Sequence, residues 1–259
     1  MALVFDNVTK MYDSKIALLD VSFEVNEGEI VSLLGPNGSG KTTAMRIAVG
    51  LLRPTRGDVY LYGHSITRDP INAKKYIGFV PESPILYDNL TGMEYLELIL
   101  DLWGYDIKDK MDEIMRLSSI LDLEQDLNTL TSTYSAGMKR KVLIIGALIH
   151  DPKVIVLDEV TANLDPKAIV SIKRLLDGLK NLNRAILIST HILEIAEEIS
   201  DRTIILRSGE IVWEGETRKF REEAQQEKRL EEIFFELTGG PAIASILEYL
   251  REKERHDLR

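Results

Sequence analysis

Gly35-Pro36-Asn37-Gly38-Ser39-Gly40-Lys41-Thr42 is the segment of this 259-residue chain from which its architecture can be inferred most directly. It follows an apolar segment at residues 30–34 and precedes a segment of helical character at residues 42–52. Glycines let the backbone turn so tightly that successive N–H groups point at one anion, and the following helix adds the positive end of its dipole. The segment therefore predicts a strand–loop–helix unit that binds phosphate groups.

A second segment predicts carboxylates at the same edge of a sheet. Residues 154–157 read Val-Ile-Val-Leu, as in a strand buried on both faces, and Asp158 and Glu159 follow directly. Ligands of α/β sheets bind at the carboxyl ends of such strands, where Asp158 can hold Mg²⁺ and Glu159 can polarise a water molecule. Each segment alone also fits an ordinary turn or strand end, but together they predict a P-loop nucleoside triphosphatase.

The nucleotide is expected on the glycine-rich loop and the first turn of the helix after it. Lys41 supplies a positive charge near the β- and γ-phosphates, and the Thr42 hydroxyl is a ligand for Mg²⁺. The predicted contacts in this segment are Gly35, Pro36, Asn37, Gly38, Ser39, Gly40, Lys41, Thr42 and Thr43.

Strand-like and helix-like segments alternate along much of the chain, which predicts an α/β fold with a mainly parallel sheet. Thr91 and Glu94 form a capping box, Ser135 starts another helix, and Ser208-Gly209 forms a hairpin turn. The expected strands are residues 2–8, 18–25, 30–34, 58–62, 76–80, 154–157, 185–189, 203–206 and 211–214, and the expected helices are residues 42–52, 91–103, 107–121, 135–150, 166–179 and 191–199.

Composition narrows the classes of function. The formal net charge is −10, which disfavours a nucleic-acid binder, because such proteins neutralise phosphates with basic patches. The absence of cysteine excludes disulfides, thiolate catalysis and Cys-ligated zinc. No signal peptide is expected, and the longest apolar run, residues 142–149, is far shorter than the roughly 20 residues of a membrane span. Any membrane role is therefore expected to come through a partner.

The segment Tyr134-Ser135-Ala136-Gly137-Met138-Lys139-Arg140-Lys141 separates this chain from other P-loop proteins. It resembles the signature motif of ATP-binding cassette (ABC) proteins, Leu-Ser-Gly-Gly-Gln in its usual form. Ser135 and Gly137 match this motif, whereas Tyr134, Ala136 and Met138 depart from it.

Further family features follow in order over residues 2–215. Tyr12 stands where the family has an adenine-stacking aromatic ring, and His191 resembles its switch histidine. Pro81-Glu82 resembles the Q-loop, and Ala162-Asn163-Leu164-Asp165 resembles the D-loop.

Two departures affect the expected chemistry. Glu82 replaces a glutamine, so it can still be a Mg²⁺ ligand but adds negative charge near the triphosphate. Ala136 replaces a glycine, which we expect to be tolerated only where φ is negative, as in a first helical turn.

The resemblance implies a RecA-like core with an antiparallel β-subdomain. Residues 1–215 would form the nucleotide-binding domain, with a helical subdomain near residues 83–150, and residues 216–259 a charged helical extension. Two cassettes, identical or different, would enclose ATP and Mg²⁺ head to tail. The implied roles are catalysis by Glu159, His191 and Lys41, metal binding by Thr42, Glu82 and Asp158, and nucleotide contact by Tyr12, Ser135, Gly137 and Asp165.

The implied function is that of the ATP-hydrolysing subunit of a transporter, held on the cytoplasmic face of the cell membrane by separate transmembrane subunits. Residues 79–82, 134–139 and 230–239 resemble the ABC-2-type export class, and residues 86–93 are the expected docking site for the membrane partner. A non-transport ABC ATPase acting on nucleic acid or ribosomes is the alternative, and a small-molecule P-loop kinase is a third reading.

Overall fold

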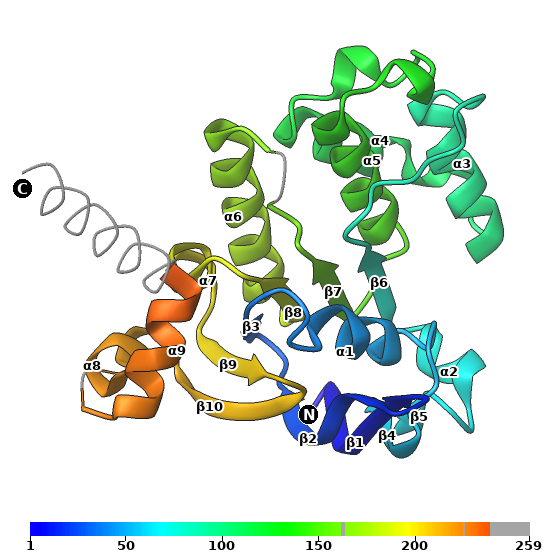
Figure 1. Ribbon diagram of the computed structural model, residues 1–259. Coiled ribbons are helices and arrows are strands. Elements are labelled where there is room, and N and C mark those ends of the chain that lie inside the picture. The colour runs from blue at the N-terminus through cyan, green and yellow to red at the C-terminus, as the bar shows by residue number, and fades with distance from the viewer. Residues whose placement is uncertain (162–163, 225, 239–259) are drawn as a thin grey trace, which may run out of the picture.

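The fold is built on two β-sheets, seen in a computed structural model that describes residues 1–161, 164–224 and 226–238 (Figure 1). A 6-stranded sheet has the order β10-β9-β3-β8-β7-β6, and a 4-stranded antiparallel sheet has the order β2-β1-β4-β5. The strands are β1 (Leu3–Tyr12), β2 (Lys15–Val25), β3 (Ile30–Leu34), β4 (Arg56–Leu61), β5 (His64–Ser65), β6 (Ile77–Val80), β7 (Val154–Asp158), β8 (Ala185–Thr190), β9 (Arg202–Arg207) and β10 (Glu210–Glu216).

The 6-stranded sheet is parallel except for β10, which pairs antiparallel with β9 through the predicted turn at Ser208-Gly209. Both faces of this sheet are buried. Val154 and Val156 of β7 pack toward one hydrophobic cluster, while Ile155 and Leu157 pack toward another. This alternation follows from the two-residue period of a strand and explains why the strand is apolar at every position.

Helices cover the two faces and extend beyond them. The helices that the described residues form are α1 (Lys41–Ala48), α2 (Pro70–Lys74), α3 (Gly92–Trp103), α4 (Ile107–Ile120), α5 (Ala136–Leu148), α6 (Pro166–Asn181), α7 (Leu193–Ile199), α8 (Phe220–Ala224) and α9 (Lys228–Thr238). α1 and the antiparallel sheet share the first cluster, and α3, α4, α5 and α6 share the second. α3, α4 and α5 form the upper lobe in Figure 1.

Most expected elements occur, but several ends differ by up to four residues, as at β1, which continues to Tyr12. Two helix ends show a clear reason for the difference. The helix predicted for residues 42–52 ends at Ala48, because Gly50 adopts a left-handed φ of 68°. The helix predicted from His191 begins at Leu193, because the Ile192 N–H donates to Thr190 Oγ1 instead of entering a helical turn. The short elements β5 and α2 have no counterpart among the expected elements.

The capped helices of the upper lobe agree with the prediction. At the start of α3, Thr91 accepts from the Glu94 N–H and Glu94 accepts from the Thr91 N–H, which is a full capping box. Ser135 caps α5 by accepting from the Met138 N–H at 3.2 Å. Ala136 is the first residue of α5, and its φ is not positive, as expected for an alanine in place of a glycine.

The described part of the C-terminal region packs on the domain core. Phe220 and Ala224 of α8 and Leu230 and Ile233 of α9 lie in one cluster with Leu34 of β3. The rest of the expected helical extension, residues 239–259, lies outside the described residues. Among the described residues, no helix combines the length and the apolar character needed to cross a membrane.

Candidate functional site

The glycine-rich loop joins β3 to α1 and depends on glycine at two positions. A Cβ atom on Gly35 would lie 2.3 Å from the Leu206 carbonyl oxygen. Gly40 is the N-cap of α1 with a φ of 115°, and a Cβ there would lie 2.6 Å from the Ala17 carbonyl oxygen. Among the described residues, no side chain caps this helix start. The first N–H groups of α1 therefore remain available to an anion.

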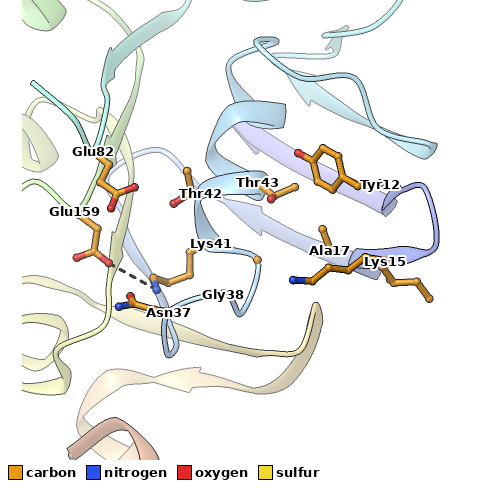
Figure 2. A pocket seen from close by; sticks show the side chains of 12 residues that line it. Tyr12, Lys15, Ala17, Asn37, Gly38, Lys41, Thr42, Thr43, Glu82 and Glu159 are labelled. Atoms are coloured by element: carbon orange, nitrogen blue, oxygen red, sulfur yellow. Dashed lines mark ion pairs between the residues drawn. The ribbon is translucent and has the colours of Figure 1, made fainter. Parts of the chain in front are cut away.

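Lys41 is the buried cation of the site. Only 5% of the residue is exposed, and its Nζ donates to the Gly35 carbonyl oxygen at 2.7 Å. The Nζ also lies 3.6 Å from Glu159 Oε1, an ion pair drawn in Figure 2. Burial lowers the pKa of Lys41, and the neighbouring carboxylates of Glu159, Asp158 and Glu82 oppose that shift. The ammonium is thus held among carboxylates in a largely dry environment.

Asp158 and Glu159 lie at the carboxyl end of β7, next to Ser189 of β8. The Ser189 hydroxyl donates to Asp158 Oδ1 and accepts from the Glu159 N–H at 2.9 Å. Burial raises the pKa of Asp158, with Glu82 and Glu159 adding to the rise, while hydrogen bonds to Ser189 and Thr42 oppose it. The carboxylates of Asp158, Glu159 and Glu82 are therefore close enough to repel one another, so a cation bound near them is electrostatically favoured.

Glu159 adopts an uncommon backbone conformation. Its φ is 49°, in the left-handed region that a residue with a Cβ seldom occupies. His191, in the segment between β8 and α7, places Nδ1 3.0 Å from Glu159 Oε2. Residues held in such a conformation are typical of functional sites, where the surrounding contacts compensate for the strain. The carboxylate of Glu159 is held in place by contacts with both Lys41 and His191.

A cavity of about 380 Å³ opens in front of the loop. In Figure 2, Glu82 and Glu159 lie at one end, Tyr12 and Lys15 lie at the other, and Lys41, Thr42 and Thr43 lie between them. The predicted residues that line it are Tyr12, Asn37, Gly38, Gly40, Lys41, Thr42, Thr43, Glu82 and Glu159. Tyr12 ends β1, 45% of the residue is exposed, and Lys10 Nζ lies 5.0 Å from the ring centroid. The cavity thus has an acidic end, Lys41 in its middle, and an aromatic end that also carries Lys15.

Three of the expected loop contacts line no part of the cavity wall. Gly35 and Pro36 instead offer their carbonyl oxygens to Lys41. The Ser39 hydroxyl is buried and has no hydrogen-bond partner among the described residues.

The residues predicted to bind Mg²⁺ are compatible with that ion. Thr42, Glu82 and Asp158 offer only oxygen atoms, which Mg²⁺ prefers, and the Thr42 hydroxyl lies close enough to the Asp158 carboxylate to oppose the rise of its pKa. Among the described residues, no three His, Cys, Asp or Glu side chains are arranged as a metal site on their own. This is also the pattern of Mg²⁺ sites that rely on one or two carboxylates, with waters and substrate phosphates completing the shell.

Asp158 and His191 are outside the cavity lining but lie next to Glu159, whereas three other predicted residues lie away from the cavity. Ser135 is exposed and Gly137 is half-buried at the start of α5, in the upper lobe. Asp165 is exposed and caps α6 by accepting from the Ala168 N–H at 2.9 Å. Ala162 and Asn163 of the expected D-loop lie outside the described residues. Within one chain, these groups therefore do not contribute to the cavity.

Three site residues carry no role in the sequence-based prediction. Lys15 lines the cavity because a two-residue turn brings the start of β2 beside Tyr12. Ser189 and Arg140 contact the end of β7 across 31 and 18 residues of sequence, respectively. Lys15 could have been identified from the sequence, because it directly follows the short turn after Tyr12. Ser189 and Arg140 could not, because no characteristic spacing relates them to Asp158.

Sequence comparison places these features in a known family. The family described as ABC transporter matches residues 18–162. The uncharacterised ABC transporter ATP-binding protein YhcH of Bacillus subtilis (strain 168) is 40% identical over 210 residues, which are 80% of this chain and 67% of the relative. The bacitracin transport ATP-binding protein BcrA of Bacillus licheniformis is 35% identical over 209 residues, which are 80% of this chain and 67% of that protein.

Solved structures show the same fold. The ATP-binding subunit of an ABC transporter superposes with a TM-score of 0.83 and 32% identity, over 92% of this chain and 100% of that one. The ATP-binding cassette MJ0796, a dimer in a post-hydrolysis state with ADP and Pi, superposes with a TM-score of 0.74 and 29% identity, over 83% of this chain and 99% of that one.

Proposed function

The chain belongs to the ABC transporter family, and on this premise we propose that the cavity at α1 is where this transporter subunit binds and hydrolyses ATP. The observation that carries the assignment is the cluster of Lys41, Asp158 and Glu159 in front of an uncapped helix N-terminus. The loop amides and Lys41 would hold the phosphates, and the exposed Tyr12 ring would stack on adenine. Lys15 lies beside Tyr12 and would add positive charge at that end.

The proposed reaction is in-line attack of water on the γ-phosphorus. Glu159 orients and activates the water, and its left-handed backbone and its contacts with Lys41 and His191 hold it in position. Lys41 would exchange its carbonyl contacts for phosphate oxygens and stabilise the charge that develops on them. His191, with 46% of its side chain exposed, would contact the γ-phosphate as well as Glu159.

Thr42, Asp158 and Glu82 are the residues that we assign to Mg²⁺. The bound ion would neutralise charge on the phosphates during transfer. Glu82 places a carboxylate where the family has an uncharged amide. This chain would therefore surround the ion with one more negative group than the family pattern does.

The second half of the composite site is proposed to come from another cassette. Ser135 and Gly137 stand at an exposed helix N-terminus, which is suited to an anion brought by a partner. A head-to-tail pair would bring this helix start, together with Asp165, to the ATP of the other chain. The dimeric arrangement described for the cassette MJ0796 supports this proposal.

We assign the 1–215 region to the nucleotide-binding domain, with a helical subdomain near 83–150 and a C-terminal extension over 216–259. The membrane partner would dock on residues 86–93, where Tyr87 is 61% exposed. The cassette would lie on the cytoplasmic face of the membrane, bound there by transmembrane subunits. The name of BcrA as a bacitracin transport protein and the ABC-2-like segments support export as the direction.

Replacing Glu159 with glutamine tests the assigned chemistry. We expect E159Q to lower steady-state ATP turnover by about 10²- to 10³-fold, because the amide cannot accept the proton of the attacking water. Binding of a fluorescent ATP analogue should change by less than about threefold, since the amide keeps the size of the side chain. The control is E194Q, which removes an exposed carboxylate on α7. Unchanged turnover in E159Q would show that the assigned base is wrong.

Recovery of the partner tests the transport assignment. The tagged chain is purified from detergent-solubilised native membranes, and the proteins that accompany it are identified by mass spectrometry. A stoichiometric multi-span membrane protein is the expected result. Recovery of ribosomes or DNA in its place would favour the non-transport alternative.

A further inference from the structure

Arg140 is a buried cation close to the carboxylates of the site. It lies one and a half turns into α5, only 1% of it is exposed, and it is absent from the cavity lining. A buried guanidinium is costly unless its N–H groups are paired, because burial removes the water that would otherwise solvate it. Its position therefore calls for a specific set of acceptors.

The acceptors are main-chain carbonyl oxygens of two different site segments. Nη1 donates to the Pro81 carbonyl at 3.2 Å and to the Asp158 carbonyl at 3.4 Å, and Nη2 donates to the Glu82 carbonyl, whereas Nε has no hydrogen-bond partner among the described residues. One planar group thus connects the loop after β6 with the end of β7. These two segments carry Glu82, Asp158 and Glu159, the carboxylates of the site.

The charge of Arg140 also matches its surroundings. Burial lowers the pKa of Arg140, while the carboxylates of Asp158, Glu159 and Glu82 oppose that shift. Lys41 serves the same carboxylates from the cavity side, but it is the group that a bound phosphate would attract. If Lys41 turned to a bound nucleotide, Arg140 would still hold a positive charge beside these carboxylates.

Arg140 belongs to the same helix as Ser135 and Gly137. α5 is 13 residues long, and its N-terminus is the part assigned to the partner's ATP. A helix is stiff over such a length, so a shift of Arg140 relative to β6 and β7 also shifts the N-terminus of α5. The guanidinium therefore links the segments that carry the site carboxylates to the helix whose N-terminus is assigned to the partner's ATP.

We propose that Arg140 is a positioning residue that couples the carboxylates of the chain's own ATP site to the α5 N-terminus offered to the partner's ATP. The inference rests on the proposed function of the cavity and of Ser135. Arg140 touches neither nucleotide. It acts by fixing the carbonyl groups of Pro81, Glu82 and Asp158 relative to α5.

Two substitutions separate the charge from the bridging geometry. R140K keeps a positive charge but has a single ammonium, which cannot reach both segments as a guanidinium does. R140Q removes the charge as well. We expect the turnover number to fall by about tenfold in R140K and on the order of a hundredfold in R140Q, since small misplacements of catalytic groups have effects of this size. Binding of a fluorescent ATP analogue should change by less than about threefold in both.

A second readout measures the coupling between the half-sites. In an E159Q background that retains ATP, we expect R140K to weaken ATP-dependent dimerisation by about 5- to 50-fold in sedimentation, the range of ordinary coupling free energies. R116Q is the matched control, because Arg116 is an exposed arginine of the neighbouring helix α4. It should leave turnover, affinity and dimerisation unchanged.

The thermal midpoint separates positioning from general loss of structure. R140K should remain folded and keep a midpoint close to that of the parent, even if R140Q loses stability. Equal losses of turnover and nucleotide affinity, or dimerisation of R140K equal to that of R116Q, would overturn the proposal. Failure of E159Q to lose turnover would instead contradict the assignment of the base and leave the Arg140 comparison intact.

Discussion

The starts of α1 and α5 are both helix N-termini, yet they are built in different ways. At α1 the N-cap is Gly40, which has no side chain, and the buried Lys41 follows in front of a cavity. At α5 the N-cap is Ser135, whose hydroxyl already accepts the Met138 N–H on an exposed surface. The α1 terminus leaves its N–H groups to a ligand, whereas the α5 terminus satisfies one of its own.

This difference shows why a helix dipole alone is insufficient for a strong anion site. The α1 site adds a cation, buried surroundings and a cavity, so an anion gains several interactions at once. The α5 start has only its dipole, free N–H groups and the Ser135 O–H, which can still donate. It becomes useful when a partner brings an anion that is already bound. We therefore expect changes at α1 to affect both nucleotide affinity and turnover, and changes at α5 to affect dimerisation and turnover but not affinity.

The largest expected effect comes from removing the cation at α1. K41A should weaken nucleotide binding strongly and lower turnover on the order of a thousandfold, because Lys41 is the buried positive charge next to the phosphate loop. The measurements are titration with a fluorescent ATP analogue and phosphate release. R46A is the control, since Arg46 is an exposed cation of the same helix. If K41A bound nucleotide as tightly as R46A, the loop amides alone would account for affinity.

A smaller effect is expected at the other terminus. S135A should leave nucleotide affinity within about threefold but lower turnover by about 10- to 100-fold, because it removes a donor to the partner's nucleotide. It also removes a helix cap, which costs about 1 kcal/mol of stability. D106A is the matched control, since Asp106 caps α4 by accepting from the Lys108 N–H and lies outside the proposed site. If D106A lost as much turnover as S135A, the loss in S135A would be explained by removal of a helix cap, and the proposed contact of Ser135 with the partner's nucleotide would be contradicted.

Local signals account for the parts of the fold that the sequence predicted well. The glycine-rich loop, the capping box at Thr91 and the N-cap at Ser135 each depend on residues within a few positions of one another. Such patterns can be read without knowing the tertiary structure. The end of α1 was placed four residues too late, because its stop at Ala48 depends on the left-handed Gly50 and not on the apolar pattern.

The site was predicted less completely because several of its contacts are non-local. Ser189 links Asp158 and Glu159 from a neighbouring strand, and Arg140 reaches Pro81 across 59 residues. Neither contact has a characteristic spacing, since both depend on the order of strands in the sheet and on the packing of α5. The roles assigned to the motif residues remain predictions that the substitutions above can test.

The smallest expected effect comes from restoring the family's glycine at α5. Ala136 is the first residue of the helix, so glycine there gains no conformation that the fold requires and loses more entropy on folding. We expect A136G to lower the free energy of unfolding by at most about 0.5–1 kcal/mol, measured by urea denaturation. Turnover should stay within about twofold of the parent. A marked rise in turnover would show that the α5 start must leave its present helical conformation to contact the partner's nucleotide, and would bring its behaviour closer to that of the glycine-capped α1.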